Sequence, residues 1–341
     1  MLTEALAPFR AIAPFIAHYP GAHALAEALR CGLVDRLAQG PATADELGHV
    51  ADLPAAGLRL LLALLRGAGV TQPDAQLTPG FRAALRHRPL LEAKLEAAAL
   101  ALPDFHAHLS PLLRDRESFM ERAAIFGLYR YDLALREDAA ALAATERWMR
   151  LTTALTRHEA PVLLALHDFS RCRRLLEPGG NSGELALQLT AAHAGIRVTV
   201  ADLPAVCALG RRHVGAAPRI DFLPTDLRHQ PMPGGHDAVL FKSMLHDWPD
   251  DAARRFLELA RAALPPGGEV LVFERMPLPS DAPLGYGQMQ DMLFHGFYRD
   301  PASYLAWLRE LGFVDLHRQE LMLDVPFVLI AGRRPGTRGP L

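Results

Sequence analysis

Three glycines stand where a short apolar run gives way to a helical pattern. Gly179, Gly180 and Gly183 follow residues 174–176 and precede residues 184–194, where apolar side chains recur at helical spacing. Glycine lets the backbone pass close to a ligand, and a helix N-terminus offers unpaired N–H groups. An ordinary glycine turn is the alternative, and the spacing differs from the G-x-G-x-x-G of dinucleotide sites. The segment predicts a ligand-binding loop.

An acidic residue ends the next apolar run. Asp202 follows residues 197–200 and stands 23 residues beyond Gly179. A carboxylate about 20 residues beyond such a loop, at the end of the second strand, can bind the hydroxyls of a ribose. Asp202 could instead cap the following helix. Coupled to the glycine loop, the ribose role is the better interpretation, so the ligand is predicted to contain a nucleoside.

His246 is the third candidate for chemistry. With Asp247 and Trp248 it comes just after the apolar run 238–241. In α/β sheets ligands bind at the carboxyl ends of the strands, and a histidine there can move a proton near neutral pH. His246, one of 15 histidines, could instead cap the helix that begins near Asp250. Asp247 and Trp248 fit a role in shaping the loop.

The elements around these residues predict an α/β domain. Apolar runs at 174–176, 197–200, 238–241 and 270–273 alternate with the helical patterns 184–194, 205–214 and 252–264. This alternation is typical of a doubly wound, mostly parallel sheet. The Gly/Pro/Arg-rich tail, residues 333–341, is expected to fray.

The first half of the chain reads as helical. Helices are predicted over residues 24–37 and 54–67, and a capping box at Thr43 and Glu46 predicts a short helix between them. A hairpin is predicted over residues 70–81. Three helices followed by a hairpin predict a winged helix. Two long helical segments, 118–136 and 139–166, are expected before the sheet begins.

Composition excludes several classes of protein. The 341 residues include 36 Lys+Arg and 38 Asp+Glu, a formal net charge of −2, which argues against broad binding to nucleic acid phosphates. The length predicts two domains. The three cysteines lie far apart and predict neither disulfides nor a structural zinc site. With no signal-peptide pattern and no apolar stretch near the roughly 20 residues of a membrane span, we expect a cytoplasmic protein.

Four motifs resemble those of one enzyme family. Residues 177–183 (EPGGNSG) resemble the D-V-G-G-G-T-G motif of S-adenosylmethionine-dependent small-molecule O-methyltransferases, the plant caffeate/flavonoid and bacterial natural-product type. Residues 202–206 (DLPAV) resemble their D-L-P-x-V, residues 241–250 (FKSMLHDWPD) contain their L-H-D-W-x-D, and residues 263–268 (ALPPGG) resemble A-L-x-P-G-G. The match is colinear and covers nearly the whole chain.

The resemblance implies S-adenosylmethionine as cofactor, S-adenosylhomocysteine as product, and no metal. It implies that the glycine loop passes beneath the methionine part, that Asp202 holds the ribose, and that Asp226 and Leu227 bind the adenine. The implied cofactor-binding residues are Glu177, Gly179, Gly180, Gly183, Asp202, Leu203, Thr225, Asp226, Leu227, Lys242 and Ser243.

The resemblance also implies that His246 is the general base and that Glu274, 28 residues further on, orients it. A phenol has a pKa near 10, so a base within hydrogen-bond reach accelerates its methylation by roughly 10²–10⁴-fold. A carboxylate on the other imidazole nitrogen fixes the tautomer. The alternative for Glu274 is a strand-end carboxylate in solvent.

Two departures from the family pattern matter. Asn181 replaces the third glycine of the loop, which asparagine tolerates because it adopts left-handed backbone conformations. Tyr298 stands where the family's G-G-x-E-R-T has the glutamate that flanks the base on its second side. The missing carboxylate leaves room for a carbon or nitrogen acceptor, or for a substrate that ionises readily.

Aromatic and methionine side chains are candidates for the acceptor pocket, with ordinary core or dimer-interface packing as the alternative. They suit a small aromatic acceptor. These candidates are Phe126, Tyr129, Trp148, Met149, Met289, Met292, Phe294, His295, Phe297 and Tyr298.

The predicted organisation has three parts: a winged-helix domain at 1–105 that forms a homodimer, a helical linker at 106–170 that contributes to the dimer and the acceptor pocket, and a cofactor-binding domain at 171–341. The predicted activity is methyl transfer to a hydroxyl of a small aromatic secondary metabolite. Alternatives are carbon or nitrogen methylation, a cofactor-binding protein without methyl transfer, a dinucleotide oxidoreductase, and a DNA-binding regulator. The last is disfavoured because residues 54–67 hold only two basic residues. Neither nucleic acid nor membrane is an expected partner.

Overall fold

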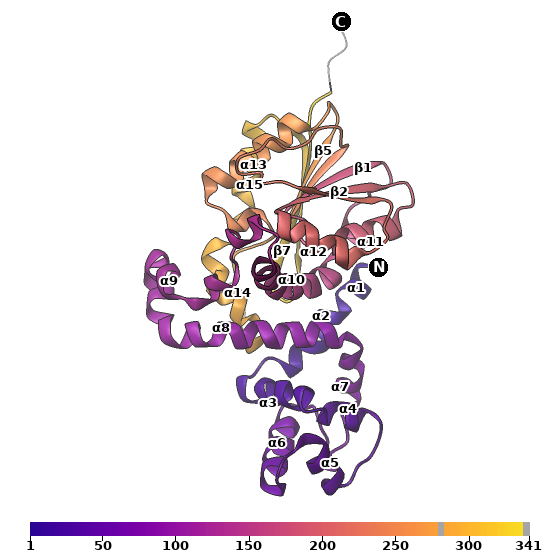
Figure 1. The fold of residues 1–341 in the computed structure, drawn as a ribbon, viewed down its shortest axis with the longest axis vertical. Coiled ribbons are helices and arrows are strands. Elements are labelled where there is room, and N and C mark those ends of the chain that lie inside the picture. Colours follow the sequence, from indigo (N-terminus) through magenta and orange to yellow (C-terminus); the bar gives the residue numbers. More distant parts are fainter. Residues whose placement is uncertain (279–282, 337–341) are drawn as a thin grey trace, which may run out of the picture. The chain divides into compact units, whose positions relative to one another are not determined.

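Within the described residues, seven strands form one sheet in the order β3-β2-β1-β4-β5-β7-β6 (Figure 1). The structure is a computed structural model and describes residues 1–278 and 283–336. The first five strands pair in parallel, and the last two form an antiparallel hairpin against β5. The strands are β1 (Arg174–Pro178), β2 (Arg197–Asp202), β3 (Ile220–Pro224), β4 (Ala238–Lys242), β5 (Glu269–Arg275), β6 (Val314–Met322) and β7 (Pro326–Arg333).

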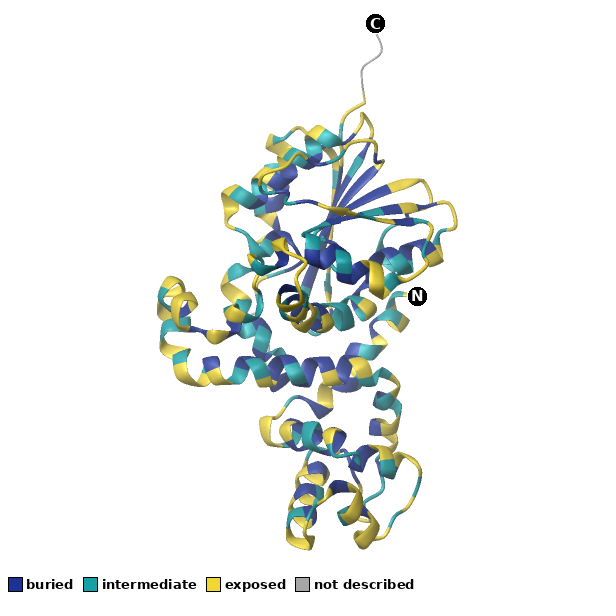
Figure 2. Ribbon diagram, viewed as in Figure 1, coloured by how far each residue is buried: buried dark blue, intermediate teal, exposed yellow. Residues whose placement is uncertain are grey.

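Helices cover both faces of this sheet (Figure 1). On one face α13 (Asp250–Ala263) and α15 (Pro301–Glu310) share an apolar cluster with alternate residues of the central strands. On the other face α11 (Glu184–Ala192) and α12 (Pro204–Val214) pack on β2 and β3, and α10 (Ala139–Leu166) packs on both of these helices. The central strands are buried almost throughout (Figure 2). The predicted doubly wound α/β fold is confirmed, and β3, β6 and β7 are additional strands.

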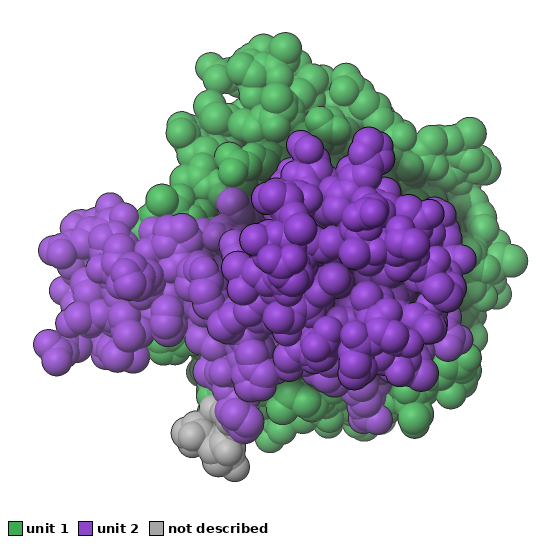
Figure 3. Space-filling view, turned by 90° about the horizontal axis from the view of Figure 1, so that it is seen from below, with its two compact units in different colours: residues 1–5, 123–279, 294–341 green, residues 6–122, 280–293 purple. Residues whose placement is uncertain are grey.

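The described chain divides into two units (Figure 3). One contains the sheet and consists of Met1–Ala5, Ala123–Pro279 and Phe294–Leu341; the other is helical and consists of Leu6–Arg122 and Ser280–Leu293. The predicted boundaries lie instead at residues 105 and 170. The prediction that the tail 333–341 frays is wrong for its first two residues, because Arg333 ends β7 and Arg334 forms backbone hydrogen bonds with Gly267 and Gly268 at 2.8 Å. Residues 337–341 of this tail lie outside the described residues.

The helical unit contains η1 (Ala13–Phe15), η2 (Leu85–His87), η6 (Tyr286–Gln288) and the helices α2 (Ala7–Ile12), α3 (Tyr19–Arg30), α4 (Leu33–Ala38), α5 (Ala44–Ala51), α6 (Ala55–Gly67), α7 (Pro79–Ala84), α8 (Arg88–Arg114) and α9 (Arg116–Arg122). The single helix predicted over 24–37 is wrong, because Gly32 adopts a φ of +78° and divides it. The predicted hairpin is reduced to one bridge between Thr71 and Leu77. The capping box of Thr43 and Glu46 is confirmed.

The segment 118–136 is not one long helix. It contains the end of α9 and two short 3₁₀ turns, η3 (Ala124–Leu128) and η4 (Leu133–Leu135), whereas the predicted long helix over 139–166 is confirmed as α10. The longest helix of the helical unit is α8, which the sequence pattern did not delimit.

A later segment of the chain returns to the helical unit. The backbone N–H groups of Tyr286 and Gly287 donate to the carbonyls of Ala17 and Ile16, at 3.0 and 2.9 Å. A buried ion pair of 3.4 Å joins Lys94 on α8 to Asp291. Asp291 lies on α14 (Met289–Phe294).

No single helix among the described residues is both long and apolar enough to span a membrane. The bent pair of α5 and α6 meets that test jointly, by length and composition only.

The turn between β1 and α11 yields a prediction about stability. Gly183 has a φ of +75°, and a Cβ there would lie 2.8 Å from Cζ of Phe222. Gly312 has the same φ with open space around it. We expect Gly183→Ala to lower the free energy of unfolding by roughly 2–4 kcal/mol and Gly312→Ala by about 1 kcal/mol, because only the first adds a clash to backbone strain.

Urea unfolding of both variants and the unsubstituted chain measures this difference. If both variants lost the same free energy of unfolding, a clash between the new Cβ and Phe222 would not contribute to the loss at position 183.

Candidate active site

The candidate residues lie at the carboxyl ends of the five parallel strands. The order of the strands places Asp226 after β3, Asp202 at the end of β2, the glycine loop after β1, His246 after β4, and Glu274 within β5. In doubly wound sheets this edge is where ligands bind. Residues that are far apart in sequence therefore line one edge, as the alternation of strands and helices predicts.

The glycine loop has the left-handed conformations that its residue types suggest. Gly179, Asn181 and Gly183 have φ values of +65°, +56° and +75°. Asn181 thus keeps the conformation of the glycine it replaces. A Cβ at Gly179 would lie 2.6 Å from Cγ of Met244, and one at Gly180 would lie 2.8 Å from the carboxyl carbon of Glu177. Close packing against this chain's own side chains thus already requires glycine at both positions.

Glu177 is a buried carboxylate with an unfilled hydrogen-bonding capacity. Its Oε2 is buried and has no hydrogen-bond partner among the described residues. Burial raises the pKa of Glu177 to about 8; Lys242 opposes this rise, and Asp202 adds to it. A buried unpaired acceptor is costly, so a cationic donor bound beside it would be stabilised.

Asp202 is held by the backbone. Its Oδ2 accepts from the N–H of Asn181 at 2.9 Å, and its Oδ1 accepts from the N–H of Leu203 at 2.7 Å. Burial raises its pKa to about 6, although both N–H bonds lower it. The alternative role as a helix cap is wrong, because α12 begins at Pro204 without a side-chain cap. Leu203 itself is half-buried.

The predicted adenine-binding residues after β3 already contact other residues of this chain. Asp226 forms a two-pronged ion pair with Arg228, with both N···O distances at 2.7 Å, and these bonds lower the pKa of Asp226. Thr225 is buried and donates its hydroxyl to Gln230. Leu227 is part of the apolar cluster beneath the sheet edge.

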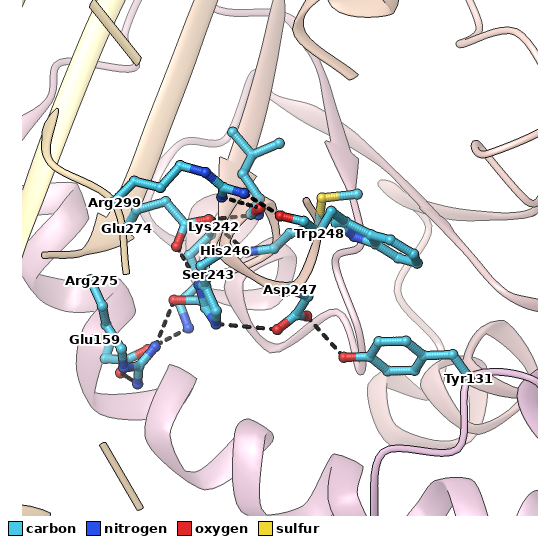
Figure 4. Close-up of polar contacts among 12 residues, drawn as sticks. Tyr131, Glu159, Lys242, Ser243, His246, Asp247, Trp248, Glu274, Arg275 and Arg299 are labelled. Carbon is cyan, nitrogen blue, oxygen red and sulfur yellow. Dashed lines mark hydrogen bonds and ion pairs between the residues drawn. The ribbon is translucent and has the colours of Figure 1, made fainter. Parts of the chain in front are cut away.

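Lys242 and Ser243 belong to a buried charged cluster (Figure 4). Lys242 pairs with Glu159 on α10 and donates to the hydroxyl of Thr156 at 2.8 Å. Arg275 bonds to the second oxygen of Glu159 at 2.8 Å and to the hydroxyl of Ser243 at 2.9 Å. The ammonium of Lys242 thus contacts α10, and any contact with a cofactor stays a prediction. Ser243 has a φ of +50°, a strained conformation that Arg275 helps to hold.

His246 and Glu274 form the shortest polar contact of the proposed base. Nδ1 of His246 lies 2.5 Å from Oε2 of Glu274. The other oxygen of Glu274 accepts from the N–H groups of Met244 and Leu245, at 2.8 and 2.7 Å. Glu274 is fully buried, so the alternative of a carboxylate in solvent is wrong. His246 does not cap the next helix either, because α13 has Pro249 at its N-cap.

The electrostatics of this pair favour a charged imidazole. Burial lowers the pKa of His246, but the carboxylates of Glu274 and Asp247 outweigh burial, and the net pKa is raised above its ordinary value. Burial raises the pKa of Glu274, but the contact with His246 and two backbone N–H bonds outweigh it, and its net pKa is lowered. A base with these neighbours keeps a captured proton more readily than a free histidine.

A second carboxylate does lie beside the ring. Oδ1 of Asp247 is 3.3 Å from Nε2 of His246, and Oδ2 of Asp247 accepts from the hydroxyl of Tyr131 at 2.8 Å (Figure 4). The family's glutamate is absent, as the sequence indicates, but Asp247 places a different carboxylate beside the second nitrogen. The 3₁₀ turn η5 (Leu245–Asp247) folds the adjacent residue back onto the histidine. Tyr298, at the family's glutamate position, lies edge-on to His246 with 5.6 Å between ring centres.

Arg299 forms hydrogen bonds with the loop that carries His246. Its guanidinium donates to the carbonyls of Leu245, at 2.8 Å, and Trp248. It also pairs with Asp250 at 2.6 Å. Within the turn the carbonyl of Leu245 also accepts from the N–H of Trp248, at 3.3 Å, so Arg299 adds a second donor to this carbonyl.

The acceptor candidates fall into two groups. Phe126, Trp148, Met149, His295 and Tyr298 lie in the unit that contains the sheet, whereas Met289 and Met292 lie in the helical unit. Trp148, Met149 and Tyr298 are buried, and His295 is exposed in the turn η7 (His295–Phe297). Within the first group, Trp148 and Met149 share an apolar cluster with Leu203.

Sequence reasoning missed several residues of this edge. Tyr131, Thr152, Thr156, Glu159 and Arg275 contact Asp247, Asn181, Lys242 or Ser243, yet none belongs to a motif. The only sequence signal is the spacing of Thr152, Thr156 and Glu159, which places them on one face of α10. No group of three or more His, Cys, Asp or Glu within the described ranges could hold a metal ion.

Known proteins resemble this chain in sequence and in fold. A family model described as an O-methyltransferase domain matches residues 107–314. Acetylserotonin O-methyltransferase of Mus musculus molossinus is 30% identical over 335 residues, which cover 89% of this chain and 84% of that protein. The solved structure of human N-acetylserotonin methyltransferase in complex with SAM has a TM-score of 0.71 and 21% identity, and the match covers 92% of this chain and 94% of that chain. That likeness shows a shared fold.

Two further relatives match over a smaller share of their length. A 3-hydroxy-5-methyl-1-naphthoate 3-O-methyltransferase of Streptomyces sahachiroi is 38% identical over 160 residues, 44% of this chain and 46% of that protein. Demethylspheroidene O-methyltransferase of Rhodobacter capsulatus is 28% identical over 255 residues, 73% of this chain and 59% of that protein. The match thus spans about half the length of these two relatives.

The raised pKa of Glu177 predicts a pH-dependent stability. The carboxyl ionises near pH 4.5 when exposed and near pH 8 when folded, so the folded state holds an extra proton between these values and loses stability as the pH rises. We expect Glu177→Gln to gain about 3 kcal/mol relative to the unsubstituted chain between pH 5.5 and 8.5. Urea unfolding at both pH values measures this gain.

Asp202→Asn is the matched control. The pKa of Asp202 is raised only to about 6, so Asp202→Asn should alter the loss of stability with rising pH mainly below pH 6. An unchanged decline above pH 6 in Glu177→Gln would contradict the assignment.

Proposed function

The chain belongs to the O-methyltransferase domain family, and from this premise we propose that it transfers a methyl group from S-adenosylmethionine to a hydroxyl of a small aromatic acceptor, with His246 as general base. The observation that carries the proposal is the contact of His246 with the buried Glu274, at the sheet edge where Glu177 keeps an unpaired buried oxygen.

The residues of the edge fit the proposed cofactor. S-adenosylmethionine, when bound, supplies a methyl group activated by its sulfonium. The unpaired Oε2 of Glu177 would accept from the ammonium of its methionine part, and the carboxylate of Asp202 would accept from the ribose hydroxyls. Asp226 and Leu227 would hold the adenine; Arg228 fixes the carboxylate of Asp226, whose oxygens each retain capacity for a further bond.

His246 is suited to remove the proton of the acceptor. Because Nδ1 contacts the buried Glu274, the second nitrogen, Nε2, is the one that can bind the acceptor hydroxyl. The O–H bond breaks, Nε2 takes the proton, and the oxygen keeps the bonding pair. Glu274 stabilises the imidazolium that forms, as in other histidine bases with a carboxylate partner.

Aromatic side chains support an aromatic acceptor. Five rings in the unit that contains the sheet contact one another with centre-to-centre distances of 5.4 to 6.2 Å; they are Phe126, Tyr129, Trp148, Phe294 and Phe297. Ring faces and edges favour flat aromatic partners. The hydroxynaphthoate named for the Streptomyces sahachiroi relative is an acceptor of this class. The Asp247 carboxylate beside Nε2 favours a hydroxyl acceptor over the carbon or nitrogen alternative.

Binding and turnover of three variants test the proposal. We expect S-adenosylmethionine to bind with a micromolar Kd, Asp202→Ala to abolish binding, and His246→Gln to keep binding but lower kcat roughly 10²–10⁴-fold. His317→Gln, an exposed histidine on β6, should change neither. Calorimetry measures binding, and mass spectrometry of a panel of hydroxynaphthoates and catechols measures methylation.

Each outcome separates one alternative. Absence of binding would contradict the methyltransferase proposal, and full kcat in His246→Gln would contradict the role of general base. Binding without methylation of any acceptor would favour a protein that has lost the reaction. A product methylated on carbon or nitrogen would show that the acceptor atom is not a hydroxyl oxygen.

We also propose that the N-terminal helices form a homodimer. On α6 the side chains of Leu60 and Leu64 are 63% and 37% exposed, and their spacing places them on one helix face. Exposed apolar side chains grouped in this way are typical of a protein interface.

Sedimentation at micromolar concentration tests the dimer. We expect a dimer for the unsubstituted chain and a monomer for Leu60→Glu/Leu64→Glu, because the charges oppose burial of this face. A monomer in both cases would contradict the proposal.

A further inference from the structure

Tyr131, Asp247 and His246 form a line of contacts that no sequence motif contains (Figure 4). The hydroxyl of Tyr131 donates to Oδ2 of Asp247 at 2.8 Å, across 116 residues of sequence. The other oxygen of the same carboxylate lies 3.3 Å from Nε2 of His246. This distance exceeds the 2.7–2.9 Å of a strong charged hydrogen bond, so Nε2 keeps capacity for the acceptor hydroxyl.

Two tryptophans hold the ring of Tyr131. Trp248 stacks on it with 6.0 Å between ring centres and an angle of 29°, and Trp148 meets it edge-on at 5.6 Å. Burial raises the pKa of Tyr131 well above its ordinary value, so its hydroxyl remains a donor at neutral pH. The direction of the donated hydrogen bond, and with it the position of the Asp247 carboxylate, is therefore fixed by packing.

Titratable groups from four segments face this carboxylate, and one of them is Asp202 at the end of β2, whose pKa Asp247 raises. Burial raises the pKa of Asp247; His246 on η5, Tyr131 from the loop before η4, and Arg275 at the end of β5 oppose this rise, while Glu274 on β5 adds to it. The net pKa of Asp247 is raised above its ordinary value, and the hydroxyl of Tyr131 is one of the groups that favour the anionic form against burial. An anion 3.3 Å from Nε2 stabilises a proton on the ring.

We propose that Tyr131 is a positioning residue of the base: its hydroxyl holds the Asp247 carboxylate beside Nε2 of His246, where this carboxylate supplies the second anionic flank of the imidazolium. This inference rests on the proposed role of His246 as general base. It explains how the base retains two carboxylates although Tyr298 occupies the family's glutamate position. The carboxylate of Glu274 contacts Nδ1 of the ring, and the carboxylate of Asp247 lies beside Nε2.

A titration of His246 in the full chain, without cofactor or acceptor, tests this role. The ring Cε1–H signal, assigned with His246→Gln, reports its pKa by NMR. We expect Tyr131→Phe to lower the pKa of His246 by about 0.5 to 1, since one hydrogen bond that favours the anionic form of Asp247 is lost. Asp247→Asn should lower it further, and the double variant should match Asp247→Asn alone, because Tyr131 acts through that carboxylate.

Tyr286→Phe is the control, since Tyr286 is a buried tyrosine of the helical unit and should leave the pKa of His246 unchanged. An unchanged pKa in Tyr131→Phe, an equal fall in Tyr286→Phe, or additive falls in the double variant would each overturn the inference. Because no methyl transfer is measured, these outcomes are independent of the activity assays with His246→Gln.

Discussion

A fully buried carboxylate at the end of β5 constrains the rest of the candidate site. Glu274 has no access to solvent, so each of its oxygens must find a donor within the protein. Two backbone N–H groups after β4 bond to one oxygen, and Nδ1 of His246 contacts the other. The chain must turn sharply after β4 to bring these donors together, and Ser243 adopts a left-handed conformation at that turn. The tautomer and the orientation of His246 follow from the same requirement.

The buried charges at this edge are distributed unevenly. Glu159 on α10 receives both Lys242 and Arg275, which ties the helix to the ends of β4 and β5. Glu177, on the neighbouring strand β1, is left with an unpaired buried oxygen. Burial raises the pKa of this carboxyl to about 8 although Lys242 opposes the rise, so a further cation beside it would favour its ionised form. The arrangement therefore favours a positively charged ligand over an empty site, which agrees with a sulfonium cofactor that also carries an ammonium group.

Packing and proton chemistry are coupled around the loop of His246. Arg299 satisfies carbonyls on one side of this loop, and Trp248 on the loop stacks on Tyr131. Such contacts hold the imidazole between the carboxylates of Glu274 and Asp247. Proton transfer depends on this placement, because a base must lie within hydrogen-bond reach of the group it deprotonates.

Local sequence patterns predicted four of the parallel strands with the helices between them, the glycine loop, and the positions of Asp202, His246 and Glu274 after or at the ends of strands. These features follow from local patterns, because parallel strands place all their carboxyl ends at one edge. The break at Gly32, the short turns where a long helix was predicted over 118–136, and the return of residues 285–287 to the helical unit depend on contacts between distant segments. The same is true of Tyr131 beside Asp247 and of Glu159 beside Lys242, which are separated by more than 80 residues. No periodicity encodes such pairs, so only the tertiary structure, through the packing of α10 and the aromatic rings around Tyr131, decided which carboxylates flank the base.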